Sequence, residues 1–241
     1  MDRLTPSACR LWWLRTAEVD QGRADHLLSD EDRARRAGLL RGPDRLRYTA
    51  ARALTRAVLA RHLGIPAAQL RIDRTCRRCG GPHGKPRAPD AGPGIDFSLS
   101  HDGGLVVLVL STGGPVGVDT EQLRPRSLPP ELAARVLHPS ELRRSGPRPG
   151  LRTLLTYWTR KESLTKATGE GVTAGFDRIE VSAPGEPPAL LRWDGHDHRV
   201  ARASMAELTL PGGYLTAVSS LGQAIDALNV QDAAPLLPDT V

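Results

Sequence analysis

The chain has 241 residues, enough for one large domain or two of about 120 residues, and either size can bury a core without disulfide bridges. Its 3 cysteines do not suit a disulfide framework, and its longest apolar run, residues 105–110, is far too short to span a bilayer. Residues 11–14 are too short for the apolar core of a signal peptide, so we expect a soluble cytoplasmic protein without membrane contact.

The net charge is +6 at pH 7, and the basic residues are unusual in kind. Of the 33 basic residues, 30 are arginines, and the three lysines are Lys85, Lys161 and Lys166. A basic surface suits nucleic acid, a phosphorylated ligand or an acidic protein, whereas a coding bias toward arginine explains the same total without any partner. The total charge leaves both explanations open, and the lysines are individually of interest.

In the first half, the spacing of apolar residues predicts two helices followed by strands. The first helix begins at Ser29 or Asp30, which can cap its N-terminus, and the second helix ends at Gly64. Residues 42–44, Gly-Pro-Asp, separate the two helices, and the Gly- and Pro-rich residues 76–94 are predicted to form a loop. The next three segments are apolar and β-branched, and we expect a three-stranded meander from residues 95–101, 105–111 and 116–121.

In the second half, one long helix precedes a returning antiparallel sheet. Residues 123–150 are interrupted by prolines, and the helix then runs from Leu151 to Gly169. The predicted strands of the sheet are residues 177–182, 190–193, 198–205 and 212–220. We place a boundary near Gly113, which divides the chain into residues 1–113, residues 114–221 and a loose, disordered tail at residues 222–241.

Two carboxylates share one face of the predicted strand at residues 116–121. Because strand side chains alternate, Asp119 and Glu121 point to one side, and Val118 and Thr120 point to the other. A solvated strand end explains the pair without any ligand. A divalent cation explains it too, since Mg²⁺ prefers oxygen ligands and typically binds one or two carboxylates together with substrate phosphates.

The long helix carries charged residues on a row that begins as apolar. This row starts at Leu151, includes Trp158, and continues in steps of four to Glu162 and Lys166. A surface ion pair at this spacing contributes only about 0.2–0.5 kcal/mol and belongs on the polar face, which the apolar row argues against. If Glu162 instead faces the two strand carboxylates across a cleft, the three can share a cation and Lys166 can neutralise phosphate oxygens.

Three further groups of polar residues are candidates for a site. Ser100 and His101 end a strand, where a lone histidine is most often structural but where both side chains could donate to phosphate beside a cation site. Lys85 lies in the rigid Gly-Lys-Pro segment of the loop. The remaining group, Cys76, Cys79 and His83, resembles half of a zinc knuckle, but no fourth ligand or second pair follows at the usual spacing, so we favour a turn with free or buried thiols.

Four segments together resemble the signature motifs of 4′-phosphopantetheinyl transferases of the surfactin-synthetase-activating (Sfp-like) type. They are WTRKESLTKATGEG at residues 158–171, GVDTE at 117–121, FSLSHD at 97–102 and GKP at 84–86. The segments follow the order of the family, with fitting spacing, and the resemblance covers about residues 28 to 220. The combination is highly specific, whereas GVDTE alone would be weak.

This resemblance implies a holo-[acyl-carrier-protein] synthase activity. The phosphopantetheine arm of coenzyme A would be transferred to a serine of an apo acyl, peptidyl or aryl carrier protein, with release of adenosine 3′,5′-bisphosphate. Asp119, Glu121 and Glu162 would hold Mg²⁺, for which Mn²⁺ could substitute. The implied fold is α+β, with two similar halves of a monomer related by a pseudo-twofold axis and the active site in the cleft between them.

The resemblance also implies roles for the other candidates. Lys166 would contact the pyrophosphate of coenzyme A, and the remaining cofactor-binding residues would be Ser100 and His101 at the phosphates, Lys85 and Pro86 at the adenine end, and Arg47 and Arg35 near the 3′-phosphate. Glu162, directly or through a water, or Lys166 would be the base for the carrier serine, and the sequence does not choose between them. Three residues depart from the family pattern, which affects 3′-phosphate recognition and not the metal site: Asp32, Ser98 and Asp102.

Carrier proteins are mostly acidic along their recognition helix, so a basic docking surface is expected. The Pro-rich segment 123–145, with Arg124, Arg126 and Leu128, is our candidate for it. A Mg²⁺-dependent hydrolase of nucleotides or pyrophosphate would use the same carboxylates and is the alternative. An arginine-rich nucleic-acid-binding protein is less consistent with the sequence, because aromatic residues are only 4% of the chain and no base-stacking motif occurs.

Overall fold

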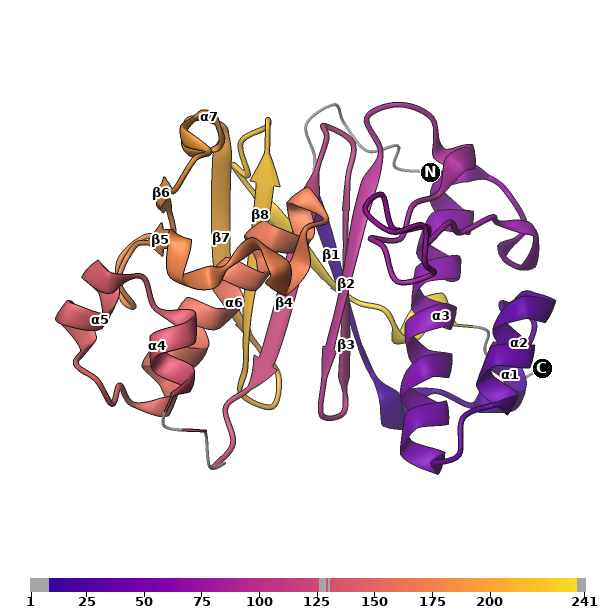
Figure 1. Ribbon diagram of the computed structural model, residues 1–241. Coiled ribbons are helices and arrows are strands. Elements are labelled where there is room, and N and C mark those ends of the chain that lie inside the picture. The colour runs from indigo at the N-terminus through magenta and orange to yellow at the C-terminus, as the bar shows by residue number, and fades with distance from the viewer. Residues whose placement is uncertain (1–8, 126–128, 130, 238–241) are drawn as a thin grey trace.

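The computed structural model describes residues 9–125, 129 and 131–237 of the chain. The fold is a mixed α+β arrangement in which two main sheets lie side by side and each is covered by a long helix (Figure 1). None of the helices in these described ranges is long and apolar enough to cross a bilayer.

The first sheet has the strand order β2-β3-β1-β9 and packs against helix α3. Its hydrogen bonds are antiparallel between β3 and both of its neighbours and parallel between β1 and β9. The strands are β1 (Cys9–Arg15), β2 (Asp96–Asp102), β3 (Leu105–Ser111) and β9 (Leu228–Asp232). The helices beside this sheet are α1 (Gln21–Ala24), α2 (Asp30–Ala37) and α3 (Gly42–Leu63).

The ends of these helices follow the predicted signals. The Ser29 side chain accepts a hydrogen bond from the Asp32 backbone N–H and caps α2, as expected. Pro43 lies in the first turn of α3, and Gly64 ends this helix with φ at +70°. The two predicted helices are therefore confirmed.

The second sheet has the strand order β4-β8-β7, all antiparallel, and packs against helix α6. The strands are β4 (Val116–Gln122), β7 (Ala203–Leu210) and β8 (Tyr214–Leu221), and α6 spans Leu151–Thr168. A two-stranded sheet and three short helices lie beside it: β5 (Ile179–Val181), β6 (Leu190–Trp193), α4 (Leu132–Val136), α5 (Pro139–Ser145) and α7 (Asp197–Val200).

The predicted three-stranded meander is wrong in its third strand. The β2–β3 hairpin forms as expected, but β4 pairs with β8 in the second sheet. The first sheet already has a partner for β3, because the unpredicted strand β1 occupies that edge. The predicted strand at residues 198–205 is only partly a strand. Its first residues belong to helix α7, in which Arg199 pairs with Glu170 and stacks on Trp193, and strand β7 begins at Ala203.

The prediction of a loose tail at residues 222–241 is wrong for the part that the structure describes. Residues 228–232 form β9, which adds a parallel strand to the free edge of β1. The Trp12 side chain donates a hydrogen bond of 2.9 Å to the Gln231 side chain, and Ala233 is fully buried. The chain therefore returns to the first sheet at its end (Figure 1), and residues 238–241 lie outside the described residues.

A row of side chains joins the two main sheets where β2 runs beside β4. The two strands are joined by hydrogen bonds in which every second side chain of β2 accepts from a backbone N–H of β4, and not by the backbone-to-backbone hydrogen bonds of a sheet. The four pairs are Asp96 with Val116 at 2.8 Å, Ser98 with Val118 at 3.2 Å, Ser100 with Thr120 at 3.3 Å, and Asp102 with Gln122 at 2.9 Å. Ser98 and Asp102, which depart from the family motif, thus hold the two sheets together.

Candidate active site

Helix α6 and strand β4 approach each other at Gly117. A Cβ atom on Gly117 would lie 1.9 Å from the Ser163 carbonyl oxygen and 2.5 Å from the Ala167 backbone nitrogen. No side chain fits in this space, so only glycine allows the helix to lie so close to the strand. The contact brings the charged end of the α6 row toward the carboxylate face of β4.

Only one of the two carboxylate oxygens of Asp119 has hydrogen-bond partners in this arrangement. The residue is 4% exposed, and its Oδ1 accepts hydrogen bonds from Ser100 Oγ at 2.8 Å and from Lys166 Nζ at 2.7 Å. Lys166 Nζ also donates to Ser100 Oγ at 3.0 Å. The other oxygen, Asp119 Oδ2, is buried and has no hydrogen-bond partner. A buried carboxylate oxygen without a partner is costly unless a ligand completes it.

Glu162 has the same property. Its Oε2 is buried without a hydrogen-bond partner, and its pKa is raised to about 7. Burial is the largest cause of the raised pKa, and the negative charges of Asp119 and Glu121 add to it, whereas Lys166 acts in the opposite direction. The three carboxylates predicted from the sequence are thus near enough to repel one another.

The carboxylate oxygens of this cluster are the type of ligand that a divalent cation such as Mg²⁺ prefers. Two buried carboxylate oxygens lack partners, and Lys166 supplies the neighbouring positive charge. Among the described residues, however, the carboxylates do not form a group whose ligand atoms all lie within 4.8 Å of one another. All three would therefore bind one ion only after side-chain movement, for which the half-buried Glu121 and Glu162 have room.

His101 lies on the opposite face of β2 from Ser100, at the edge of this cluster. Its pKa is lowered, first by partial desolvation and then by the positive charges of Arg47 and Lys166. His101 is exposed. Arg47 is half-buried, and its Nε has no hydrogen-bond partner. A neutral imidazole among cations suits an anionic ligand.

Comparison with known proteins agrees with this geometry. The model of the 4′-phosphopantetheinyl transferase superfamily matches residues 115–219, and the model of the N-terminal domain of 4′-phosphopantetheinyl transferases matches residues 15–113. The 4′-phosphopantetheinyl transferase HetI of Nostoc sp. is 35% identical over 170 residues, which are 68% of this chain and 69% of HetI. A phosphopantetheinyl transferase of Thraustochytrium sp. is 30% identical over 212 residues, 79% of this chain and 71% of that protein.

The chain belongs to the 4′-phosphopantetheinyl transferase superfamily. It is of the two-domain type, with an N-terminal and a C-terminal transferase domain. Its activity is that of a phosphopantetheinyl transferase acting on carrier proteins. The 4′-phosphopantetheinyl transferase of Bacillus subtilis is also similar, with 30% identity over 117 residues, 47% of each chain.

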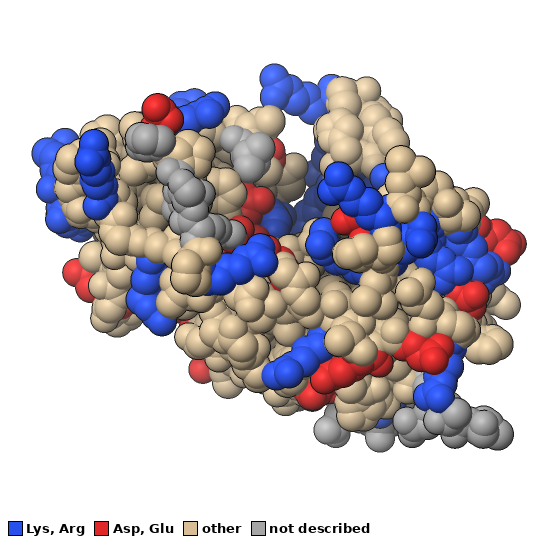
Figure 2. All heavy atoms as spheres, turned by 90° about the horizontal axis from the view of Figure 1, so that it is seen from below, with Lys and Arg blue, Asp and Glu red and all other residues tan. Residues whose placement is uncertain are grey.

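The surface of the transferase is hollowed on the face shown in Figure 2. Acidic atoms lie in the wall of this hollow, and Lys and Arg side chains surround it. In this hollow, the basic side chains could contact a negatively charged ligand, and the acidic side chains could contact a cation bound to it.

Lys85 joins three segments of the transferase. Its Nζ donates to the Asp96 carboxylate and to the backbone carbonyls of Val116 at 2.9 Å and Ala167 at 3.1 Å. Burial lowers the pKa of this lysine, and the ion pair with Asp96 opposes that effect. All three protons of its ammonium group are thus engaged between β2, β4 and the end of α6, with the half-buried Pro86 beside it. The contact of Lys85 and Pro86 with adenine stays a prediction.

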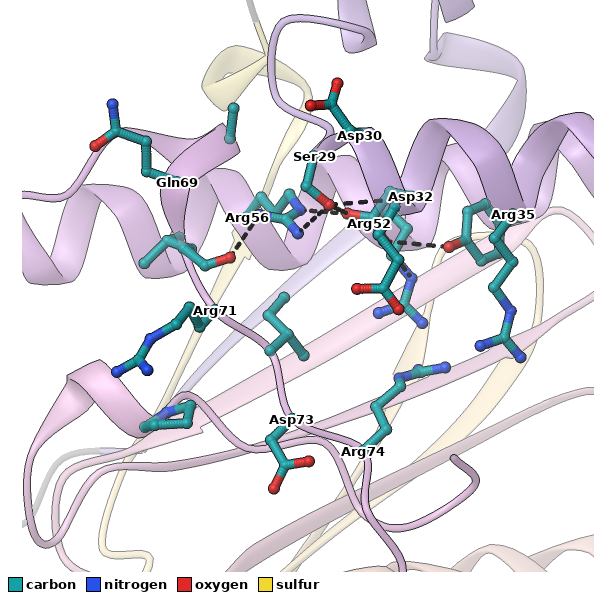
Figure 3. A pocket seen from close by; sticks show the side chains of 16 residues that line it. Ser29, Asp30, Asp32, Arg35, Arg52, Arg56, Gln69, Arg71, Asp73 and Arg74 are labelled. Carbon is teal, nitrogen blue, oxygen red and sulfur yellow. Dashed lines mark hydrogen bonds and ion pairs between the residues drawn. The ribbon is translucent and has the colours of Figure 1, made fainter. Parts of the chain in front are cut away.

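Sequence reasoning missed two arginines that converge with Arg35. A pocket of about 540 Å³ lies between α2, the first half of α3 and residues 68–74. In it the side chains of Arg35, Arg52 and Arg74 point toward one another (Figure 3). Burial lowers the pKa of Arg74 to about 10, with further contributions from the charges of Arg52 and Arg35. The spacing of Arg52 on α3 could have indicated a buried position, but Arg74 lies in a loop without periodicity.

Four carboxylates also line this pocket, those of Asp30, Glu31, Asp32 and Asp73, and Asp32 lies 3.8 Å from the Nε of Arg52. Asp32 binds the Nε of Arg56 at 2.5 Å and also accepts hydrogen bonds from Ser29 and Tyr48. The Nε atoms of Arg52 and Arg74 are buried without a hydrogen-bond partner. The five arginines that line the pocket outnumber its four carboxylates by one, and the open guanidinium donors fit a phosphate group. Arg47 does not line this pocket.

Lys161, one residue before Glu162, has a different environment. It is fully buried, and its Nζ donates to Glu141 Oε2 at 2.5 Å and to the carbonyls of Val136 at 2.7 Å and Phe176 at 3.0 Å. Glu141 in turn accepts the backbone N–H groups of His138 and Val181. This pair fastens α6 to the segment that contains α4 and α5.

The predicted docking segment, residues 123–145, is only partly described. Arg126 and Leu128 lie outside the described residues. Arg124 is exposed and forms an ion pair with Asp102 at 3.4 Å. On α4 and α5, Arg135 and Arg143 are exposed.

Proposed function

We propose that this transferase uses coenzyme A and Mg²⁺ to modify a serine of an apo acyl, peptidyl or aryl carrier protein. The serine hydroxyl attacks the phosphorus that carries the pantetheine arm, and a new P–O bond forms to the serine. The bond to the other phosphate of the pyrophosphate breaks, and adenosine 3′,5′-bisphosphate leaves with the electron pair. The serine proton passes to a base. Such a reaction depends mainly on positioning and on neutralising charge.

The observation that carries this proposal is the pair of unpartnered buried oxygens, Asp119 Oδ2 and Glu162 Oε2. We assign the Mg²⁺ site to Asp119, Glu121 and Glu162, the carboxylates that meet where α6 packs on β4. When bound, the ion would neutralise pyrophosphate oxygens and orient them for in-line displacement. Lys166 bonds to Asp119 in this structure. In the complex we expect its ammonium group to turn to the pyrophosphate, with Ser100 and His101 donating to phosphate oxygens.

Glu162 is the stronger candidate for the base. Lys166 already donates to Asp119 and Ser100, so its protons are engaged as donors. The Oε2 of Glu162 is buried without a hydrogen-bond partner, so this oxygen is free to accept the serine proton, directly or through a water.

We place the 3′-phosphate of coenzyme A in the pocket of Arg35, Arg52 and Arg74. The guanidinium groups of Arg35, Arg52 and Arg74 point toward one another there, which favours a doubly charged phosphate. The test is the ratio of kcat/KM for coenzyme A to that for 3′-dephospho-coenzyme A. In the wild type the ratio should be about 10 or more, and Arg74→Ala should reduce it toward one. Arg47→Ala is the control: if it changes the ratio and Arg74→Ala does not, the 3′-phosphate lies at Arg47.

The carrier protein would approach the second half of the chain. We propose that the two halves, residues 1–113 and 114–221, are similar units related by a pseudo-twofold axis, with the nucleotide on the first and the carrier on the second. Exposed Arg135 and Arg143 support an acidic partner at segment 123–145. Replacing both arginines by glutamate, Arg135→Glu with Arg143→Glu, should raise KM for the carrier protein and leave KM for coenzyme A unchanged.

Mass spectrometry tests the proposed function directly. Apo carrier proteins from fatty-acid, polyketide and nonribosomal-peptide systems are incubated with the transferase, Mg²⁺ and coenzyme A, and at least one should gain one phosphopantetheine. Omitting Mg²⁺ should stop the gain. Turnover of coenzyme A without any carrier would instead support the hydrolase, and no gain on any carrier class would contradict the proposal.

A further inference from the structure

A second group of ligand side chains lies outside the active site, in the loop before Lys85. The sulfurs of Cys76 and Cys79 and a ring nitrogen of His83 all lie within 4.8 Å of one another. Cys79 Sγ is 2.9 Å from His83 Nε2, and neither cysteine forms a disulfide. Among the described residues this is the group of Cys, His, Asp and Glu side chains that meets this distance limit.

The backbone of the loop is folded around Cys76. The loop turns back on itself within a few residues of Cys76, which places the second cysteine and the histidine beside it. Two backbone hydrogen bonds of 2.8 Å join Cys76 to Gly80 and Gly81 and close the turn. Arg77 and Arg78, which separate the two cysteines in the chain, are both exposed.

Two glycines make the cluster possible. Gly80 directly follows the second cysteine and has φ at +75°, which other residues rarely adopt. A Cβ atom on Gly81 would lie 3.1 Å from the His83 ring and 3.5 Å from Cys79 Sγ. The turn therefore favours glycine at position 80 for its backbone conformation, and a side chain at position 81 would crowd the histidine that lies over the second sulfur.

The loop has no hydrophobic core of its own. None of residues 74–87 is buried. Its base is closed by paired backbone hydrogen bonds between Asp73 and Arg87, at 2.9 and 2.8 Å. Arg74 of the phosphate pocket lies at one end of this loop, and Lys85, which joins β2, β4 and α6, lies at the other. A segment so exposed needs another source of order, and a bound metal can supply it.

We propose that Cys76, Cys79 and His83 bind a zinc ion, with the fourth position open to water or an outside ligand. Two thiolates and a neutral imidazole balance the charge of the ion, and binding releases the two thiol protons. Thiolate and imidazole are the ligands that zinc prefers, whereas Mg²⁺ prefers the oxygen ligands of the active site. The metal holds the loop between the phosphate pocket and the seam of the two sheets.

Metal content of the full chain tests this proposal. The protein is purified under reducing conditions, reconstituted with zinc, and dialysed against excess Mg²⁺ so that the active-site carboxylates hold no zinc. Elemental analysis should give about one zinc per chain, and the Co²⁺-loaded protein should show sulfur-to-cobalt charge-transfer absorption. Cys76→Ser with Cys79→Ser should reduce the zinc content by about tenfold and abolish the absorption, as thiolates supply both.

Cys9→Ser is the matched control, because Cys9 is buried in β1 and belongs to another part of the fold. This variant should keep its zinc. No zinc in the reconstituted wild type, zinc retained in the double serine variant, or a Cys76–Cys79 disulfide in place of zinc would each overturn the proposal. Glu162→Gln should keep the zinc while losing transfer activity, so failure of the zinc site is distinguishable from failure of the proposed function.

Discussion

Helix α6 carries two buried charged clusters whose environments differ. Lys161 and Glu141 are both 0% exposed, and the contacts of this ion pair use all three lysine protons and both carboxylate oxygens. Glu162, the next residue, faces Asp119 and Lys166, and in this second cluster two buried oxygens have no partner. Adjacent residues of one helix thus belong to a complete cluster and an incomplete one.

The difference separates a structural role from a ligand-binding role. In a buried ion pair whose hydrogen bonds are all made, removing either partner leaves the other charge buried and unpaired, which destabilises the fold. A buried carboxylate oxygen with no partner costs free energy in the unliganded protein and recovers it when a ligand binds. Substituting a residue whose polar contacts are complete should therefore reduce stability, and substituting a residue with an unpartnered oxygen should reduce activity.

Breaking the complete cluster should have the largest effect on stability. Glu141→Gln leaves the Lys161 ammonium group buried without its counter-charge, and the free energy of unfolding should fall by about 3–5 kcal/mol. Urea unfolding at pH 7 measures the change. A loss below about 1 kcal/mol would show that the pair is not structural.

Substitutions in the incomplete cluster should do the reverse. Asp119→Asn and Glu162→Gln remove charge from the proposed cation site, and kcat/KM for transfer should fall by about 10²–10³. In Glu162→Gln the free energy of unfolding should stay the same or rise, since a like charge is removed from beside Asp119 and Glu121, whereas Asp119→Asn also loses the ion pair with Lys166 and should lose some stability. The exposed Glu18→Gln is the control for charge alone and should change neither quantity. A large loss of stability in Glu162→Gln would place Glu162 with the structural residues.

The contact at Gly117 should couple both properties. Gly117→Ala forces α6 away from β4, because its Cβ would overlap the Ser163 carbonyl, and about 1–3 kcal/mol of stability should be lost. The concentration of Mg²⁺ needed for half-maximal activity should rise as well. Gly150→Ala is the matched control, since a Cβ there meets nothing within 4 Å. Equal effects of the two alanines would contradict the positioning role.

The pH dependence of Mg²⁺ binding should be a smaller effect with a defined sign. Because the pKa of Glu162 is raised to about 7 in the folded chain, the folded state keeps a proton that the unfolded state loses near its ordinary value of 4.5. Glu162 therefore lowers stability as pH rises from 4.5 to about 7, and Mg²⁺ must displace its proton below pH 7. Calorimetry in two buffers should detect nearly one proton released at pH 6 and almost none at pH 8.

Glu162→Gln should release no proton at either pH. Release that is unchanged in this variant would assign the titration to another group.

Much of the geometry of the candidate active site could be predicted from local patterns. Strand alternation put Asp119 and Glu121 on one face, and helical spacing put Glu162 and Lys166 on one row, as the structure has them. The partner of β4 could not be predicted, because its pairing with β8 joins segments nearly 100 residues apart and its seam with β2 uses side chains. Arg74 was missed because its place beside Arg35 depends on how a loop folds over α2 and α3.

The end of the chain was misread for a related reason. Only Leu228 and Val230 alternate in β9, too few to predict a strand, and the open edge of β1 determines the pairing.

Unfolding with and without Mg²⁺ tests the central claim, that the unpartnered oxygens of Asp119 and Glu162 form a cation site. At fixed coenzyme A and with Mg²⁺ at about 100 times its dissociation constant, the wild type should gain about 2.7 kcal/mol in the free energy of unfolding. Glu162→Gln at the same concentrations should gain little. Equal gains in the two proteins, or none in either, would contradict the claim.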